Sequence, residues 1–164
     1  MNGKKILVVY YSRTGTTKLV AEKIQAHLGS EIEEIIDTKS RTGFLSYLRC
    51  GMDATFKRLT VIREPKNDPQ NYEPVVIGTP VWSHTIAPAV RTYIKQKSAV
   101  FKKVAFFCTS GGGSNEHALK DMEDLCSKKP IATLELSEAD VAAENIGETL
   151  KEFITKTTLA TRQS

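Results

Sequence analysis

Residues suited to binding an anion gather in a hydroxyl-rich segment near the N-terminus. The segment reads SRTGTT and follows an almost continuous apolar run, KILVVYY, at residues 5–11. Where a buried strand leads into a helix, the backbone amides and the helix dipole favour a negatively charged group. The residues concerned are Ser12, Arg13, Thr14, Gly15, Thr16 and Thr17. Because serine and threonine are also common helix caps, a simple N-cap stays open as the alternative.

The guest that best fits this segment is a single phosphate monoester. Neither the triphosphate-binding pattern GxxxxGK[ST] nor the dinucleotide-binding pattern GxGxxG occurs in the sequence. A nucleoside triphosphate with magnesium and a dinucleotide are therefore not expected. The position of the segment directly after the first buried strand favours the phosphate site over the simple cap.

The surrounding sequence alternates apolar runs with helical patterns, which indicates five β-α units. Right-handed crossovers between such strands produce a parallel sheet with helices on both faces. Because ligands of these sheets bind beyond the carboxyl ends of the strands, residues 12–17, 80–84 and 110–114 are expected to meet at one edge. Pro80 is expected to end the third strand. Strands are predicted at residues 5–11, 31–36, 74–79, 103–109 and 131–136.

Helices are predicted between these strands from apolar residues at helical spacing. The first ends at a Gly29 cap, and the fourth begins at an N-cap on Ser114. Between residues 44 and 56, apolar residues repeat every four positions and predict the second helix. The last helix is expected around residues 146–154, with little left to bury from residue 157 onward.

Length and composition indicate one folded domain over residues 1–164. The chain has 40% hydrophobic and 26% charged residues and a mean hydropathy of −0.27. Its longest apolar run is far shorter than the roughly 20 residues that span a bilayer, and its flanks do not resemble a secretory signal. We therefore expect a cytoplasmic protein with no membrane insertion.

Charge and cysteine content argue against further classes of protein. The 23 basic and 19 acidic residues give a net charge of +4, which is mild for a nucleic-acid-binding protein. The segment from Lys39 to Lys66, with both ends included, has seven basic residues and two acidic ones, so one side of the molecule is expected to be basic. Cys50, Cys108 and Cys126 form no CxxC pair. We therefore expect buried free thiols, no metal site and no nucleic-acid partner.

The segment SRTGTT after KILVVYY resembles the phosphate loop of the flavodoxin family, whose pattern is roughly [ST]-x-T-G-x-[ST]. The resemblance continues in the same order through VVIGTPVW at residues 75–82, APAVRTYI at 87–94 and FFCTSGGG at 106–113. It implies a flavodoxin-like three-layer α/β sandwich with a five-stranded parallel sheet of order 2-1-3-4-5, which binds FMN noncovalently. The direct passage from LELSE at 134–138 into the last helix resembles the short-chain members.

The resemblance implies that three segments bind FMN, with residues 12–17 as the phosphate loop. The loop beside the isoalloxazine matches Thr79, Pro80, Val81, Trp82 and Ser83. The loop over the pyrimidine edge of the flavin matches Thr109, Ser110, Gly111, Gly112 and Gly113. Trp82, the only tryptophan, is expected to stack on the flavin. His84 is open between a solvated residue and a contact with flavin or substrate, whereas His117 is expected to be exposed or to cap a helix.

Two functions follow from the resemblance and from the features particular to this chain. The resemblance implies one-electron transfer with a redox partner protein. The alternative is two-electron, FMN-dependent reduction of quinones or similar small-molecule acceptors. The basic charge and the absence of glycine from PVWSHT at residues 80–85 favour this alternative. A basic segment near the flavin would bring the two one-electron potentials together, so little semiquinone would accumulate.

A protein of another class, a receiver-like module with the same sheet and no flavin, is disfavoured. Such a module needs clustered acidic residues after the first strand to hold magnesium. Here Tyr11, Ser12 and Arg13 follow that strand. The flavin-binding interpretation is therefore the stronger one.

Overall fold

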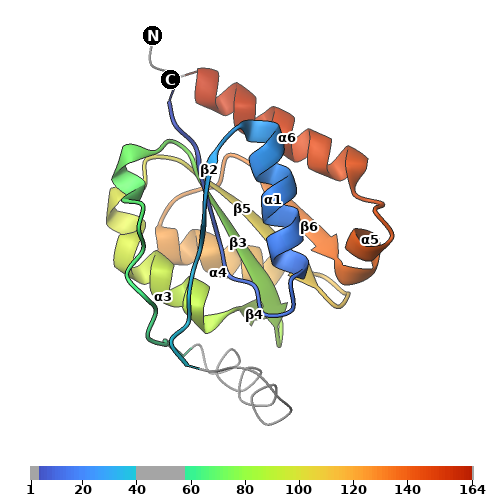
Figure 1. The fold of residues 1–164 in the computed structure, drawn as a ribbon, viewed down its shortest axis with the longest axis horizontal. Helices are drawn as coiled ribbons and strands as arrows, with labels where there is room; N and C mark the ends of the chain where they lie inside the picture. Colours follow the sequence, from blue (N-terminus) through green and yellow to red (C-terminus); the bar gives the residue numbers. More distant parts are fainter. Residues whose placement is uncertain (1–3, 40–57, 164) are drawn as a thin grey trace.

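A parallel β-sheet lies between two layers of helices in the computed structural model, which describes residues 4–39 and 58–163 (Figure 1). The strands are β1 (Leu7–Tyr10), β2 (Glu31–Glu34), β3 (Val75–Trp82), β4 (Thr85–Ile86), β5 (Val104–Ser110) and β6 (Thr133–Ser137). The helices are α1 (Thr16–Leu28), α3 (Pro88–Lys97), α4 (Glu116–Cys126), α5 (Glu138–Ala142) and α6 (Gly147–Arg162), with short 3-10 turns η1 (Pro69–Asn71) and η2 (Ser98–Val100). The helix predicted at residues 44–56 lies outside the described residues.

The strand order is β2-β1-β3-β5-β6 with parallel neighbours, and β4 pairs antiparallel with the end of β3. This order confirms the predicted sheet of five parallel strands and adds a short sixth strand. β1 reads LVVY and is buried at every position, because it lies inside the sheet with helices over both faces. β2 forms one edge of the sheet and is exposed at both of its ends.

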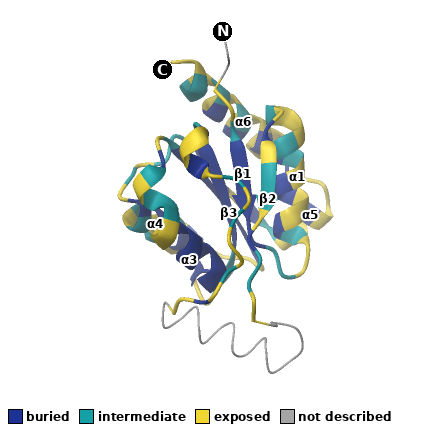
Figure 2. Cartoon of the chain, turned by 60° about the vertical axis from the view of Figure 1, so that its left-hand side comes forward, coloured by how far each residue is buried: buried dark blue, intermediate teal, exposed yellow. Residues whose placement is uncertain are grey.

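The two faces of the sheet carry separate apolar clusters. Figure 2 shows the buried strands with helices on either side of them. Successive residues of a strand point to opposite faces, so Val9 belongs to the cluster under α3 and α4, whereas Val8 belongs to the cluster under α1 and α6. α1 buries Thr17, Val20, Ala21 and Ile24, a stripe at helical spacing. Gly29 ends α1 at φ 60°, which confirms the predicted cap.

The prediction that Pro80 ends the third strand is wrong. β3 continues to Trp82, and Pro80 pairs with Thr109 of β5. The amide of Val75 donates toward β5 and the carbonyl of Gly78 accepts from Tyr11 on the other side, so position 80 turns its nitrogen toward the β1 side. β1 has already ended there, at Tyr10. A proline nitrogen without a hydrogen is therefore tolerated at this place in the ladder.

Three further details of the sequence prediction also need correction. α4 has its N-cap at Asn115 instead of Ser114. The chain does not pass directly from β6 into the last helix, because α5 begins at an N-cap on Ser137, whose hydroxyl accepts from the Asp140 amide. The last helix extends to Arg162, and Thr157 on it is fully buried. The C-terminal segment thus packs on the sheet beyond the predicted end.

The two cysteines in the described part of the chain are free and buried, as predicted. They are Cys108 on β5 and Cys126 at the end of α4, and Cys50 lies outside the described residues. Burial raises the pKa of each of the two described thiols to about 12. Both thiols therefore stay protonated at neutral pH. Within residues 4–39 and 58–163, no helix has the length and apolar character needed to cross a membrane.

Candidate functional site

The structure brings the three predicted loop segments to one edge of the sheet. Residues 12–17 connect β1 to α1, the end of β3 runs beside the end of β5, and residues 111–115 connect β5 to α4. The most direct link is a hydrogen bond of 2.8 Å between the hydroxyls of Thr17 and Thr109, both buried. The first and third segments are thus held together by a side-chain contact between residues 92 positions apart.

The segment 12–17 has the geometry of an anion cradle. Its Gly15 has φ 102°, a left-handed conformation that favours glycine, and the Ser12 hydroxyl accepts from the Gly15 amide at 3.1 Å. The Leu19 amide donates to the Gly15 carbonyl and closes the first turn of α1. The amides of that turn, between Gly15 and Leu19, are the free donors that the start of a helix offers. A Cβ at Gly15 would meet no described atom within 4 Å, which leaves open space before the loop. These features fit a phosphate group.

The segment after β5 is shaped by two glycines and a buried asparagine. Gly112 and Gly113 have φ 136° and 89°, backbone angles that residues with a side chain rarely adopt. Asn115 is 4% exposed, and its side-chain amide donates to the Ser110 hydroxyl at 3.1 Å. Its backbone amide donates to the Glu135 carboxylate at 3.2 Å. The Ser110 side chain therefore shapes the loop. No local sequence pattern indicated the role of Asn115, because one of its two partners, Glu135, lies on another strand, β6.

The predicted loop beside the isoalloxazine is a β-hairpin. Val81 and Trp82 at the end of β3 pair with β4, and Ser83 and His84 form the turn with φ 48° and 62°. Two positive φ values are typical of the tight turns that join antiparallel strands, although glycine or asparagine usually occupies them. The sequence pattern SH gave no hairpin signal for this reason.

Individual side chains of the hairpin have different environments. The Thr79 hydroxyl is fully buried and accepts from the Ala87 amide at 3.1 Å, so it holds the base of the hairpin. Trp82 is half-buried and packs edge-on against Tyr11, with ring centroids 5.8 Å apart. His84 is exposed. The structure therefore leaves Trp82 and His84 at the surface of this edge of the sheet.

A buried ion pair anchors the hairpin from below, and the sequence analysis did not find it. Arg91 on α3 donates to the Thr85 hydroxyl at 2.8 Å and to the Asp121 carboxylate on α4 at 3.1 Å. The side chains of Arg91 and Asp121 are only 5% and 16% exposed. Thr85 in turn donates to Asp121. These three residues come from three separate elements, so no local pattern could have indicated their contact.

The two histidines of the region line one open hollow. His84 from the turn and His117 from the first turn of α4 border a space of about 400 Å³, together with Lys120 and Asp124. His117 is exposed, as the sequence analysis allowed. Among the residues that the structure describes, no group of three or more His, Cys, Asp and Glu side chains is arranged to hold a metal ion.

Comparisons with known proteins agree with this architecture. Residues 5–154 match a protein-family model described as flavodoxin. A flavoprotein from Lactobacillus acidophilus, crystallised in complex with FMN, is 25% identical with a TM-score of 0.69, over 87% of this chain and 97% of that chain. No curated protein matches the sequence significantly.

Two further solved structures share the fold. A candidate flavoprotein from Bacteroides uniformis has a TM-score of 0.73 at 23% identity, over 94% of this chain and 99% of that chain. An NADH:FMN oxidoreductase in its apo form has a TM-score of 0.62 at 13% identity, over 95% of this chain and 89% of that chain. At these identities the likeness concerns the fold alone.

Proposed function

This chain belongs to the flavodoxin family, and we propose that it binds FMN and transfers electrons through that cofactor. The observation that carries this proposal is the junction of the 12–17 segment with the end of β5 through the bond between Thr17 and Thr109. This hydrogen bond joins an anion cradle to a glycine-rich loop at the carboxyl edge of a parallel sheet, which is the usual ligand position in this architecture. FMN, which has a phosphate at one end and a flavin ring at the other, matches those two parts.

The phosphate end is held by residues 12–17 in this proposal. The amides at the N-terminus of α1 donate to the phosphate oxygens, and the helix dipole stabilises their charge. Thr14 is exposed on the loop and adds its hydroxyl, whereas the Thr17 hydroxyl shares its hydrogen bonding with Thr109. Gly15 permits the turn that directs these donors outward.

The flavin end lies between the hairpin and the glycine loop in this proposal. When bound, FMN supplies reversible uptake of one or two electrons. The amides of residues 111–113 read the polar edge of the ring, because glycines let the backbone approach closely. Trp82 covers part of the ring and excludes water from it. The hairpin that carries Trp82 is fixed by Arg91 and Asp121.

The visible absorption spectrum of the purified protein tests the proposal. We expect a flavin spectrum after purification or after addition of FMN, with Trp82 emission quenched in the loaded protein and recovered when the flavin is removed. Protein that takes up no FMN at micromolar concentration would contradict the proposal. Unchanged Trp82 emission with bound FMN would contradict only the stacking role of this residue.

A second candidate function is two-electron reduction of a quinone or a similar small acceptor. It is favoured by the hollow that His84 and His117 share beside the hairpin turn, where an acceptor has polar side chains to contact. The turn itself has Ser83 and His84 and no glycine. The predicted basic helix at residues 44–56 lies outside the described residues.

Photoreduction of the FMN-loaded protein separates the two functions. Little semiquinone absorption during the titration supports the two-electron reductase, and its near-complete accumulation supports a one-electron shuttle with a protein partner. In the reductase, His84→Ala is expected to slow reduction of the small acceptor, because His84 lines the hollow in which the acceptor would lie. Location in the cytoplasm and a single domain over residues 1–164 stay predictions of the sequence.

A further inference from the structure

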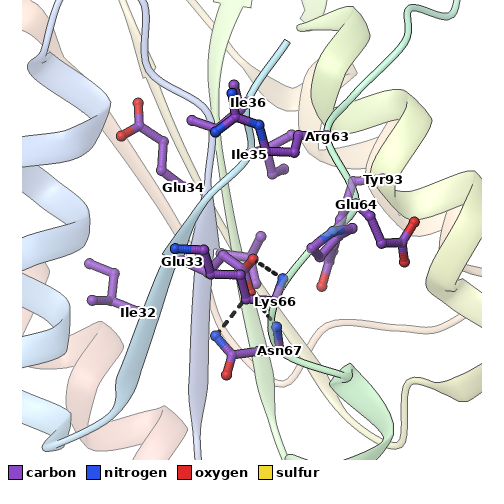
Figure 3. A pocket seen from close by; sticks show the side chains of 12 residues that line it. Ile32, Glu33, Glu34, Ile35, Ile36, Arg63, Glu64, Lys66, Asn67 and Tyr93 are labelled. Atoms are coloured by element: carbon purple, nitrogen blue, oxygen red, sulfur yellow. Dashed lines mark hydrogen bonds between the residues drawn. The ribbon is translucent and has the colours of Figure 1, made fainter. Parts of the chain in front are cut away.

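A second cavity lies between the edge strand β2 and the segment at residues 63–67 (Figure 3). Residues 62–67 run antiparallel to this edge and are attached to it at two places. At one end the Arg63 amide donates to the Ile36 carbonyl at 2.8 Å. At the other end the Glu33 carboxylate accepts from the backbone amide of Lys66 and, at 2.9 Å each, from the backbone amide and the side chain of Asn67.

Between these two attachments, β2 and the segment at residues 62–67 are not joined by backbone hydrogen bonds. Pro65 lies there and has no N–H to donate, so the segment cannot continue as a hydrogen-bonded strand. The space that results has a volume of about 260 Å³. None of the residues predicted to bind FMN is among its described lining residues. The cavity is therefore separate from the proposed cofactor site.

The base of this cavity holds a polar atom without a partner. Tyr93 on α3 is 1% exposed, and its hydroxyl makes no hydrogen bond within the described part of the chain. Its ring is fixed by stacking on Phe101, at a centroid distance of 6.1 Å. Figure 3 shows the Tyr93 side chain across the cavity from Glu33. An unpaired buried hydroxyl is unfavourable, so a ligand that pairs with it gains affinity.

The charges around the cavity favour a neutral ligand. Glu33 and Glu64 line it together with Arg63 and Lys66, so the acidic and basic side chains balance. The Glu34 carboxylate lies on the other face of the sheet, where it accepts from the Tyr10 hydroxyl. The Glu33 carboxylate already accepts hydrogen bonds from Lys66 and Asn67. Burial raises the pKa of Tyr93, and the carboxylates of Glu33 and Asp68 raise it further, so the hydroxyl stays protonated and acts as a donor. A negatively charged ligand would be repelled by these same carboxylates.

The remaining walls are apolar. Val9 of β1 and Ile35 belong to the apolar cluster on this face of the sheet, and Ile36 follows in the residues after β2. A ligand that fills this space must therefore be mainly hydrocarbon, with its polar atom placed toward Tyr93. A ketone attached to an apolar ring combines these features, since its oxygen accepts a hydrogen bond and carries no charge.

We propose that the cavity between β2 and residues 62–67 is a binding site for a small, neutral, mainly apolar carbonyl compound whose oxygen accepts a hydrogen bond from Tyr93. The site is separate from the FMN site and does not depend on the proposed electron-transfer function. Its walls supply the apolar contacts, and Tyr93 supplies the polar specificity.

The proposal is tested with two probes of nearly the same shape, acetophenone and α-methylstyrene, in which a CH₂ group replaces the carbonyl oxygen. Each is titrated by ligand-observed NMR against the FMN-loaded full chain and against its Tyr93→Phe variant. We expect acetophenone to bind the unaltered protein about fivefold to tenfold more tightly than the variant. The affinity of α-methylstyrene should differ by less than about twofold between the two proteins.

Two results would overturn the proposal. One is acetophenone binding that is equal in both proteins or does not saturate. The other is acetophenone binding that changes the flavin spectrum and ignores Tyr93→Phe, which would place the ketone at the flavin instead.

A stability measurement checks whether the Tyr93 hydroxyl already has a partner, such as trapped water. The urea midpoint of Tyr93→Phe should equal or exceed that of the unaltered protein, because an unpaired hydroxyl is removed. Tyr72→Phe is the matched control, since the Tyr72 hydroxyl donates to Glu31 at 2.6 Å and its loss should lower the midpoint. A midpoint that falls equally in both variants would contradict an unpaired Tyr93 and overturn the site.

Discussion

The two ends of the candidate FMN site are built in different ways. The 12–17 segment is made mainly of backbone, with Gly15 in a left-handed conformation and the helix N-terminus beside it. The hairpin end depends on side chains that are far apart in the sequence, above all Arg91 and Asp121 beneath Thr85. A short local pattern therefore suffices to specify the first end, whereas the second end exists only in the folded protein.

This difference predicts where substitutions act. At the hairpin end, one side chain supports several elements, so its loss should affect stability strongly. At the phosphate end, the backbone carries the geometry, so the loss of one hydroxyl should affect stability less. The predictions below test this contrast from the largest expected effect to the smallest.

Arg91→Ala should lower the free energy of unfolding by about 3–5 kcal/mol, because it removes one partner of a buried ion pair and leaves the Asp121 carboxylate without that partner. Urea unfolding of the apoprotein measures the change. The double variant Arg91→Met/Asp121→Leu should recover much of the loss, since it removes both charges together.

Lys156→Ala is the matched control for this prediction. Lys156 pairs with Glu152 at 2.7 Å on the surface of α6, with both side chains more than half exposed. Its loss should change stability by less than about 1 kcal/mol. An Arg91 effect as small as the Lys156 effect would show that the hairpin does not depend on the buried pair.

Thr17→Val should lower the free energy of unfolding by about 1–3 kcal/mol, because it leaves the buried Thr109 hydroxyl without its partner. Thermal or urea unfolding of Thr17→Val, Thr109→Val and the double variant forms a complete cycle. The double variant should lose less than the sum of the single variants. Strict additivity would mean that the two hydroxyls contribute independently and do not join the two loops.

The buried thiol of Cys108 on β5 should make the stability of the protein depend on pH in the alkaline range. The folded pKa of Cys108 is raised to about 12 from an ordinary value of 9.0, so the unfolded chain releases this proton first. The contribution of this thiol to the free energy of unfolding should therefore be fully present below about pH 9. It should then fall by about 1.4 kcal/mol per pH unit as the pH rises toward 12. Cys108→Ala should make the decline shallower by that amount in urea unfolding between pH 9 and 11. An unchanged slope would contradict burial of the thiol.

The smallest effect concerns the left-handed residues of the two ends. His84 has φ 62°, which is unfavourable for a side chain, so His84→Gly should stabilise the hairpin by up to about 1 kcal/mol. Gly15 already suits its φ of 102°, so Gly15→Ala should destabilise the protein by about 1–2 kcal/mol although no described atom lies near the added Cβ. Changes of the same sign in thermal unfolding would contradict this contrast.

The parallel sheet and the first loop were predictable because their signals are local. The run at residues 5–11 is apolar at every position, and the glycine and hydroxyl residues after it mark the turn into α1. Each of these features depends only on residues that are close together in the sequence. The strand order then followed from the resemblance to flavodoxins and is confirmed by the observed pairing.

The hairpin and its support could not be predicted because they depend on long-range geometry. Pro80 is compatible with β3 only because β1 ends before it, a fact about a neighbouring strand. Arg91 reads as an ordinary helix residue until α4 brings Asp121 beside it. The cavity at Tyr93 likewise requires the segment 62–67 to return to the edge of β2.

The central claim is that residues 12–17 bind the phosphate of FMN, and the most direct test compares the affinities of the apoprotein for FMN and riboflavin. We predict that FMN binds at least about a hundredfold more tightly, because two or more charge-assisted hydrogen bonds each contribute about 1.5–3 kcal/mol. Thr14→Ala should narrow this ratio, whereas Thr158→Ala on α6 should leave it unchanged. Equal affinity for the two flavins would contradict the claim.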